Sequence, residues 1–449
     1  MPAIQASGLA SGLDTASIIN GLVAAESQPI TDLRNRQSAF KSQVSQLGQI
    51  ASKIAALQSA AQALKSGAVQ FGVQSSNVAF SATPGTDASA GDYSIQVTQL
   101  ATAAKYRSQA AADSDTFSGG TLHLSVRGTN TDVSIADGAT LSDMALAINQ
   151  SGAAVTASVI SDGTNSYLSV VNRDTGVPSG VDPANALTFS FDASGAGGNT
   201  LTMSQVTAAQ NAALTVDNLP VSSASNTVAG IIPGVTLNLK SKSTSAEQLT
   251  IGTDADATTS KLQAFVDAYN GVASLLQQQL DVSATSDRTG TLAGDPTVRS
   301  LQQQLQSLVA SAVGASGSSV RSLPDLGITT AQDGTLSLDS SKLQAALAQD
   351  PGAVNAIFTQ PTTGLVAATK TLSDLYTDPV SGAPVIRQQG PNNQVTQMDD
   401  QASQMQARID SFRATLLQQF TAMETIVSAL KSSSNYLTQV SNASSSSSG

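Results

Sequence analysis

Few residues in this chain have the types and spacing that catalysis or metal binding requires. His123 is the only histidine among the 449 residues. It lies in an alternating apolar–polar stretch that predicts a strand, with no partner of a catalytic set beside it in the sequence. A histidine-based zinc site needs several imidazoles and is therefore excluded. Cysteine is absent, so disulfides, thiolate nucleophiles and Cys-based metal sites are excluded as well.

Asp254 and Asp256 have the spacing that opens a calcium-binding loop. The glycine and the bidentate glutamate that such a loop needs further on are missing, so these residues predict a turn and a helix start. No phosphate-binding glycine loop and no nucleophile elbow occurs. A catalytic carboxylate pair that the fold brings together from distant segments remains an open alternative. We expect a protein that binds and organises other proteins, without catalysis, cofactor or metal.

The composition narrows the classes of partner. The net charge is −11, only 12% of the residues are charged and 40% are hydrophobic. No basic cluster occurs, which argues against nucleic acid because phosphate neutralisation dominates that affinity. No apolar run reaches the roughly 20 residues of a membrane span, and residues 1–20 lack a cleavable signal. These signals by themselves indicate a cytoplasmic protein. The lack of cysteine fits either chance or a chain that is unfolded during transport.

Both ends of the chain are predicted to be helical. Near the N-terminus, apolar residues recur every seven positions and predict a helix over about 30–65 that Gly67 ends. A shorter helix capped by Asp14 precedes it, and Pro29 is expected to separate or kink the two. The first seven-residue line consists of Leu33, Phe40, Leu47 and Ile54.

The C-terminal end has the strongest periodic signal. Its apolar line continues for seven members, and a second line runs beside it. Two interpretations stay open: one long helix packed on its own domain, or a coiled coil with the N-terminal helix or with neighbouring copies. The first line is Val395, Ala402, Ile409, Leu416, Met423, Leu430 and Leu437, and the second includes Met398, Met405, Phe412, Phe420 and Val427.

The middle of the chain is predicted to be β-rich. Between residues 71 and 252 the apolar pattern has period two, as in Tyr93–Val97 and Leu122–Val126. Asp162-Gly163 predicts a tight turn, and a short helix is expected over Leu141–Asn149. Helical faces return between residues 258 and 378, with a hairpin at Gly334–Leu338. Helices on both sides of a β insertion imply nested domains whose chain ends meet.

Four segments together resemble the bacterial flagellar filament capping protein family, also called hook-associated protein 2. Ser11–Glu26 is similar to that family's opening. Leu141–Gly176 resembles the flagellin IN motif, and Asn211–Ser241 resembles the start of the family's C-terminal region. Leu323–Pro351 is the most diagnostic segment.

The resemblance implies a protein exported unfolded through the flagellar type III apparatus, without a cleaved signal, to the distal tip of the flagellum. This replaces the cytoplasmic interpretation with an extracellular one. The family forms a homo-oligomeric ring that retains exported flagellin and promotes its folding and insertion. The implied partners are other copies of the chain, flagellin, hook–filament junction proteins and an export chaperone on the C-terminal helix. An adhesin that binds host mucin or glycans through the head is the alternative, and nothing favours a cell-wall hydrolase.

Pattern and resemblance together predict an α+β multidomain fold, with coiled-coil legs from both termini, a helical-rich domain and two nested β-rich head domains. The expected parts are 1–40 with 396–449 (terminal leg), 41–70 with 255–395 (helical-rich leg domain), 71–110 with 205–254 (β-rich head) and 111–204 (outer head with the IN-like motif). The residues expected to contact the oligomer or filament are Leu33, Phe40, Leu47, Ile54, Ile409, Phe412, Leu416, Met423 and Leu430.

Overall fold

The structure is a computed structural model in which the chain forms two compact units. It describes residues 12–75, 78–195, 198–281, 290–312, 314 and 317–445, so most of the opening motif at Ser11–Glu26 is covered but its first residue is not. The first unit consists of Met1–Lys65, Lys261–Lys342 and Ala356–Gly449, and the second of Ser66–Ser260 and Leu343–Asn355.

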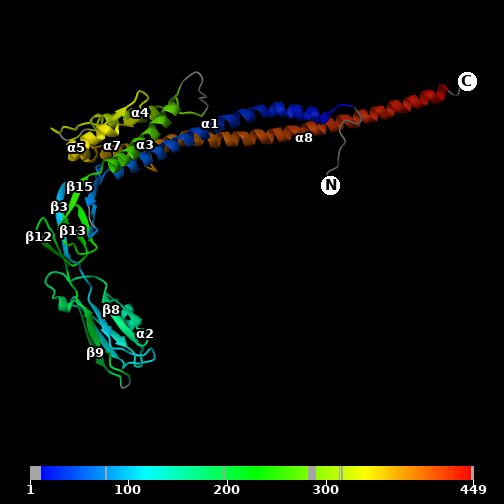
Figure 1. Ribbon diagram of the computed structural model, residues 1–449. Coiled ribbons are helices and arrows are strands. Elements are labelled where there is room, and N and C mark those ends of the chain that lie inside the picture. The colour runs from blue at the N-terminus through cyan, green and yellow to red at the C-terminus, as the bar shows by residue number, and fades with distance from the viewer. Residues whose placement is uncertain are drawn as a thin grey trace. The chain divides into compact units, whose positions relative to one another are not determined.

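The first unit is built on two long helices. Helix α1 (Thr15–Ala63) and helix α8 (Ala383–Ser445) lie side by side (Figure 1). Shorter helices pack near one end of this pair, and a small hairpin lies among them. These elements are α3 (Ala255–Leu280), α4 (Pro296–Ala310), the 3₁₀ turn η2 (Leu323–Leu326), β16 (Ile328–Thr330), β17 (Leu336–Leu338) and α7 (Leu365–Thr377). Helices α5 (Ser340–Gln349) and α6 (Pro351–Thr359), like α3, cross the boundary between the units.

Helix α1 begins as the sequence predicts but does not break as predicted. The Asp14 carboxylate accepts a hydrogen bond from Ser17 N at 3.0 Å, which satisfies one of the free N–H groups of the first turn. The expected separation of two helices at Pro29 is wrong, because α1 continues through it. A proline removes one main-chain hydrogen bond. Ile30 and Leu33 of the next turn are buried, and their packing keeps this part of the chain helical.

The predicted end of this helix at Gly67 is also misplaced. The helix ends at Ala63 with Leu64 as its C-cap, and Leu64 N donates to Ala61 O at 2.9 Å. Gly67 lies further on, with φ +125°, where the chain turns toward the first strand. Leu57, Ala61 and Leu64 are buried, so the apolar face of the helix continues to its C-cap.

Buried polar contacts fix the shorter helices of the first unit. Asn270 of α3 holds the β17 backbone from both sides: its Nδ2 donates to Leu336 O at 2.8 Å, and Leu336 N donates to its Oδ1 at 2.7 Å. Tyr269 is fully buried beside α4, and burial raises its pKa to about 12. Ser373 of α7 donates to Gln58 Oε1 of α1 at 2.7 Å. The predicted hairpin at Gly334–Leu338 is confirmed as β16–β17.

The second unit consists of antiparallel sheets. One five-stranded sheet has the order β1-β15-β3-β11-β12, and a three-stranded sheet has the order β13-β14-β2. Their strands are β1 (Phe71–Ser75), β2 (Phe80–Pro84), β3 (Gly91–Gln99), β11 (Ala212–Val216), β12 (Leu219–Ser223), β13 (Thr227–Ile232), β14 (Val235–Leu239) and β15 (Glu247–Thr253).

The remaining strands of the second unit form two further sheets, with orders β10-β4-β8-β7 and β6-β5-β9. Their strands are β4 (Lys105–Ser108), β5 (Gly120–Val126), β6 (Thr129–Ile135), β7 (Val155–Ser161), β8 (Ser166–Asn172), β9 (Leu187–Ala193) and β10 (Met203–Thr207), with helix α2 (Leu141–Gln150) and the 3₁₀ turn η1 (Pro183–Asn185) among them.

The predicted turn and short helix between these strands are confirmed. Asp162-Gly163 lies in the turn between β7 and β8, with Gly163 at φ +92°. Thr140 caps α2, and Thr140 N donates to the Asp143 carboxylate at 3.0 Å, which completes a capping box. Asn149 of α2 bonds Ala157 of β7 through both amide atoms, at 2.8 and 2.9 Å. These two bonds fix the helix to the sheet.

The sheets enclose two hydrophobic cores. Fully buried Phe117 belongs to the core of β4–β10 and α2. Phe80 belongs to the core of β2, β3, β11, β13, β14 and β15. The α+β multidomain fold class is therefore confirmed, with helices from both termini and several sheets from the middle of the chain. The four-part division into domains stays a prediction.

If the two cores are independent, a cavity in one should leave the other intact. Phe117→Ala should cost about 3–5 kcal/mol in its own core. Hydrogen exchange should then show reduced amide protection in β5 and unchanged protection in β14. Phe80→Ala is the matched variant and should give the reverse pattern. Equal loss of protection in both strands for either variant would mean that the cores unfold together.

Candidate functional site

The pairing of α1 with α8 gives the predicted contact residues their positions. Gln37 Nε2 of α1 donates to Val395 O of α8 at 3.4 Å and also bonds the Asp399 carboxylate. Gln388 Nε2 of α8 donates to Val44 O of α1 at 3.2 Å. As the residue number rises along α1, it falls along α8. The two helices are therefore antiparallel.

The predicted contact residues of α1 lie mostly on its buried side. Leu33, Leu47 and Ile54 are buried, and Phe40 is half-buried. Their seven-residue spacing places them along one edge of the helix. Ile50 and Leu57, which form a neighbouring seven-residue line, are also buried and widen this side of the helix.

The predicted contact residues of α8 divide into two groups. Ile409 and Leu416 are buried, with 4% and 9% of their surface exposed. Met423 is half-buried, whereas Phe412 and Leu430 are exposed by 38% and 64%. Of the interpretations left open for this helix, pairing with the N-terminal helix of the same chain is the one observed. Contact of these residues with other copies or with a filament stays a prediction.

Helix α8 extends beyond the described part of its partner. The hydrogen bonds of Gln37 and Gln388 set a register that, continued along both helices, brings Thr15 opposite Leu417. Helix α1 starts at Thr15, whereas α8 continues to Ser445. Figure 1 shows this last part of α8 running past the start of α1.

The extension carries an exposed apolar face, which we call the distal stripe. Its four members are Ile426, Leu430, Leu437 and Val440, and each has about half or more of its surface exposed. Their spacing puts them on one face of a helix with 3.6 residues per turn. Sequence periodicity identified Leu430 and Leu437, but it missed Ile426 and Val440 because they lie off the seven-residue lines. A helical-wheel count over this segment alone finds them.

The base of α8 is fixed to the helical unit by an ion pair. Arg387 Nε lies 2.5 Å from Asp295 Oδ2, and Asp295 also caps α4 by accepting from Thr297 N at 2.8 Å. Burial pushes the pKa of Asp295 up, but the Arg387 guanidinium and Thr297 N–H outweigh it and hold the pKa below its usual value. Residues 92 positions apart form this pair, so no local sequence pattern indicates it.

The only histidine sits between two carboxylates on the exposed face of a sheet. His123 of β5 lies directly opposite Asp132 of β6, whereas on the other side it lies opposite Ser190 of β9, and Asp192 is its diagonal neighbour two residues further along that strand. Its Nδ1 lies 2.6 Å from Asp132 Oδ1 and its Nε2 lies 3.4 Å from Asp192 Oδ2. The hydrogen bond and charge of Asp132, with a smaller contribution from Asp192, raise the pKa of His123. The position of His123 in a strand is as predicted.

The aspartate considered as the start of a calcium-binding loop has a structural role. Asp254 caps α3 by accepting from Ala257 N at 2.8 Å, in agreement with the predicted turn and helix start. Among the described residues, no group of three or more His, Cys, Asp or Glu side chains is placed to hold a metal ion. None of the helices in the described part of the chain is long and apolar enough to cross a membrane.

Comparison with protein families gives three matches along the chain. The model described as Flagellar hook-associated protein 2 N-terminus matches residues 11–104. The Flagellin hook IN motif matches residues 121–174, and Flagellar hook-associated protein 2 C-terminus matches residues 209–432. The order is the one expected from the sequence segments.

Individual proteins match over nearly the full length. The chain is 34% identical to Flagellar hook-associated protein 2 of Escherichia coli O157:H7, over 98% of each chain. It is 31% identical to A-type flagellar hook-associated protein 2 of Pseudomonas aeruginosa, over 96% of each. The crystal structure of the D1-D2-D3 domains of the flagellar cap protein FliD from Escherichia coli matches with a TM-score of 0.67 and 30% identity, covering 77% of this chain and 99% of that one. None of these names mentions a catalysed reaction or binding to host glycans, so the adhesin alternative is without support.

The His123 carboxylate pair should make the stability of its sheet depend on pH. Because the folded pKa is raised, protonated His123 adds stability that is fully present below the unfolded pKa of about 6.5. This stability is lost as the pH rises through the folded pKa. His123→Gln should therefore be less stable than the original chain in acid and equal to it in alkali, as measured by chemical denaturation across pH. A constant difference between the two proteins at every pH would show that the pair does not act electrostatically.

Proposed function

Because the chain belongs to the flagellar hook-associated protein 2 family, we propose that it caps the distal end of a flagellar filament as a homo-oligomer. The family resemblance seen in the sequence is confirmed by full-length relatives and by the cap structure from Escherichia coli. The proposal places the chain outside the cell, in the machinery of motility. Its role is binding and assembly rather than catalysis.

The distal stripe is the observation that carries this proposal. Apolar side chains lined up on one face of an exposed helix are costly to leave in water, and exposed apolar patches typically mark interaction sites. The stripe lies on a helix whose base is fixed by the Asp295–Arg387 pair. A fixed base with an uncovered end suits a helix that contacts copies of the cap or subunits of the filament.

We further propose that the cap retains exported flagellin and promotes its folding and insertion. Incoming flagellin must bury apolar helices before it leaves the tip, and a partly apolar leg can hold it there without covalent chemistry. The chain's low fraction of charged residues, 12%, means that few ion pairs have to be broken when such contacts exchange. When the cap first assembles, before the filament grows, its neighbours are the hook–filament junction proteins.

An export chaperone is proposed to cover the C-terminal helix before secretion. The same apolar face would otherwise be exposed in the cytoplasm, where it favours aggregation. Chaperone and oligomer would then compete for the distal stripe. The four-part arrangement of terminal leg, helical leg domain, inner head and outer head stays part of this proposal.

The distal stripe gives a direct test by substitution. Leu430 is 64% exposed, so Leu430→Asp should leave the unfolding temperature of the free monomer unchanged. In an assembled leg the carboxylate would be buried without a partner, which costs several kcal/mol. A cap-less strain complemented with this variant should swim at least about tenfold less in soft agar and lose flagellin to the medium.

Two further variants separate assembly from folding. Ser432→Asp places the same charge on the opposite side of the helix and should restore swimming. Leu416→Asp replaces a side chain that is buried within the chain, so it should also destabilise the monomer, by about 2–5 kcal/mol. Immunoblots of secreted protein separate failure of export from failure of capping. Normal swimming with Leu430→Asp would show that the distal stripe is not needed for capping.

A further inference from the structure

The part of the second unit that contains β4–β10 has two sheets whose outward faces differ in charge. Leu168 and Val170 of β8, like Leu122 and Leu124 of β5, are buried in one shared core. Because side chains alternate along a strand, the residues between them point away from that core. The sheets β10-β4-β8-β7 and β6-β5-β9 therefore each have one outward face, and the two faces lie on opposite sides of the core.

The outward face of β10-β4-β8-β7, which we call the basic face, carries positive charge. Tyr106 packs against the core, so its neighbours Lys105 and Arg107 point outward. Arg173 directly follows buried Asn172, and its main-chain N–H still pairs with the neighbouring segment at 3.0 Å, so it points outward as well. The basic face consists of Lys105, Arg107, Ser158, Ile160, Tyr167 and Arg173.

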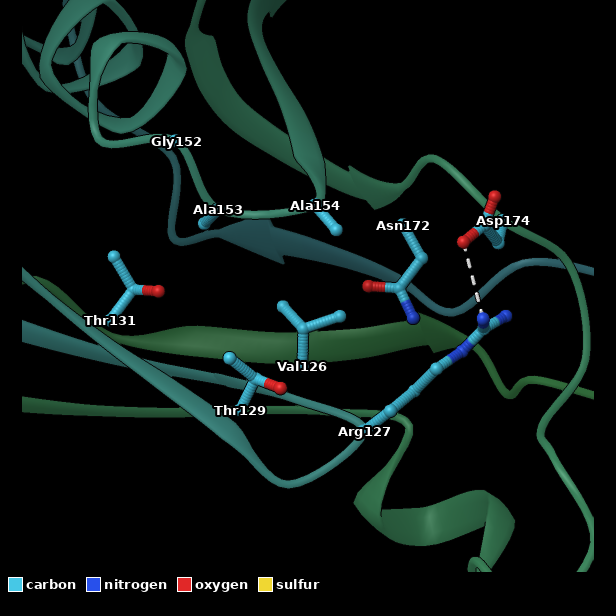
Figure 2. A pocket seen from close by; sticks show the side chains of 9 residues that line it. All are labelled: Val126, Arg127, Thr129, Thr131, Gly152, Ala153, Ala154, Asn172 and Asp174. Carbon is cyan, nitrogen blue, oxygen red and sulfur yellow. Dashed lines mark hydrogen bonds and ion pairs between the residues drawn. The ribbon is translucent and has the colours of Figure 1, made fainter.

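The positive charges of the basic face have no carboxylate partner within the described chain. Four Lys and Arg residues lie between positions 105 and 207. Arg127 is neutralised by Asp174, whose Oδ2 lies 3.2 Å from Arg127 Nη1 (Figure 2). The other three, Lys105, Arg107 and Arg173, form no ion pair among the residues that the structure describes. Their charge is available to a partner.

Arg107 is held against the surface of the basic face. Its guanidinium carbon lies 4.8 Å from the centroid of the Tyr167 ring, which is a cation–π distance. The Tyr167 hydroxyl donates to Asp162 Oδ2 at 2.9 Å, and Asp162 Oδ1 accepts from Thr164 N and Asn165 N. Local bonds thus occupy this carboxylate at the end of the face, and exposed Arg107 keeps N–H groups for a partner.

The outward face of β6-β5-β9, which we call the acidic face, has the opposite charge. Asp132 and Asp192 flank His123, and their side chains are 67% and 78% exposed. No lysine or arginine lies in these three strands. When His123 is protonated one of the two negative charges remains, so the face is negative in either state. The acidic face consists of His123, Asn130, Asp132, Ser134, Ser190 and Asp192.

The two faces match in charge and in size. Three strands about 4.8 Å apart, with outward side chains about 6.8 Å apart along each strand, cover roughly 300 Å². A stable interface usually takes about 800 Å² from each partner. These faces alone therefore cannot hold two free copies together. They can fix how neighbouring copies meet once another contact, such as the distal stripe, holds those copies close.

We propose that the basic face of one copy docks on the acidic face of the next copy in the cap. The proposal rests on the homo-oligomer proposed above and assigns it a second contact. Two basic or two acidic faces would repel each other, so the charges favour head-to-tail docking over a symmetric pair. Because the faces lie on opposite sides of one core, each copy can use both at once, and a head-to-tail contact of this kind can close a ring.

Cross-linking of cysteines in assembled caps tests this contact. The chain contains no cysteine, and Ser158 and Ser134 are exposed on the basic and the acidic face. A cap-less strain expresses Ser158→Cys and Ser134→Cys chains together, and caps on its isolated filaments are treated with a flexible bismaleimide. Covalent dimers of the chain should form there, whereas strains that express either variant alone should give almost none.

Charge reversal tests whether the charges hold the two faces together. Arg107→Asp in the Ser158→Cys chain should lower the dimer yield about three- to tenfold, because attraction is replaced by repulsion. Asp192→Arg in the Ser134→Cys chain should then restore the yield, which also shows that Arg107→Asp folds. Lys242→Asp makes the same charge change at an exposed lysine outside both faces. This matched control should leave the yield unchanged.

The proposed contact is wrong if the strain with both cysteines swims but gives no covalent dimer. The capping role would then stand, and slow reaction of both thiols with a maleimide would mean that flagellin covers these faces. Equal dimer yields from either variant alone would show that like faces meet. A yield that Arg107→Asp leaves unchanged would show that the charges do not direct the contact. Failure of the unchanged chain to restore swimming would instead contradict the capping role, and this contact with it.

Discussion

The antiparallel pairing of α1 with α8 is the contact on which the organisation of the chain depends. It joins segments separated by more than 300 positions, as the bond of Gln37 to Val395 shows. With the two ends held together, the strands between α1 and α3 must leave the helical unit and the chain must return to it. This explains why the sheets form an insertion in the middle of the chain. It also places both terminal helices in the same unit.

The pairing has a limited length, and the proposed function follows from that limit. Buried Leu33, Leu47 and Ile409 belong to the paired part, whereas Leu430 and Leu437 lie beyond it. The paired part stabilises the chain itself. The unpaired part offers apolar surface worth about 1.5–3 kcal/mol per side chain when fully buried, so its four members together are of the same order as the loss of rotational and translational freedom on association. The proposed contacts with several copies or with a filament would add further buried surface to this balance.

Much of the fold could be predicted because local rules decide it. Asp14 as a helix cap, the Asp162-Gly163 turn and the alternating strands follow from side-chain chemistry within a few residues. Pro29 is the opposite case, since packing of Ile30 and Leu33 overrides a local preference for a break. Strand order was beyond reach, because β3 pairs with β11 and β15 from distant parts of the chain. In the candidate site, the seven-residue line identified Leu430, but the ion pair of Asp295 with Arg387 depends on tertiary contacts that no sequence spacing encodes.

The proposed function requires that the distal stripe is covered by protein when the cap is in place. The chain contains no cysteine, so Leu430→Cys introduces a single thiol whose reactivity follows its exposure. The rate of its reaction with a maleimide can be measured in the free monomer and in caps on isolated filaments, with Ser432→Cys as the reference. If the stripe is covered, the rate for Leu430→Cys should be at least about tenfold lower on filaments, with a much smaller change for Ser432→Cys. Equal rates for Leu430→Cys in the two states would contradict it.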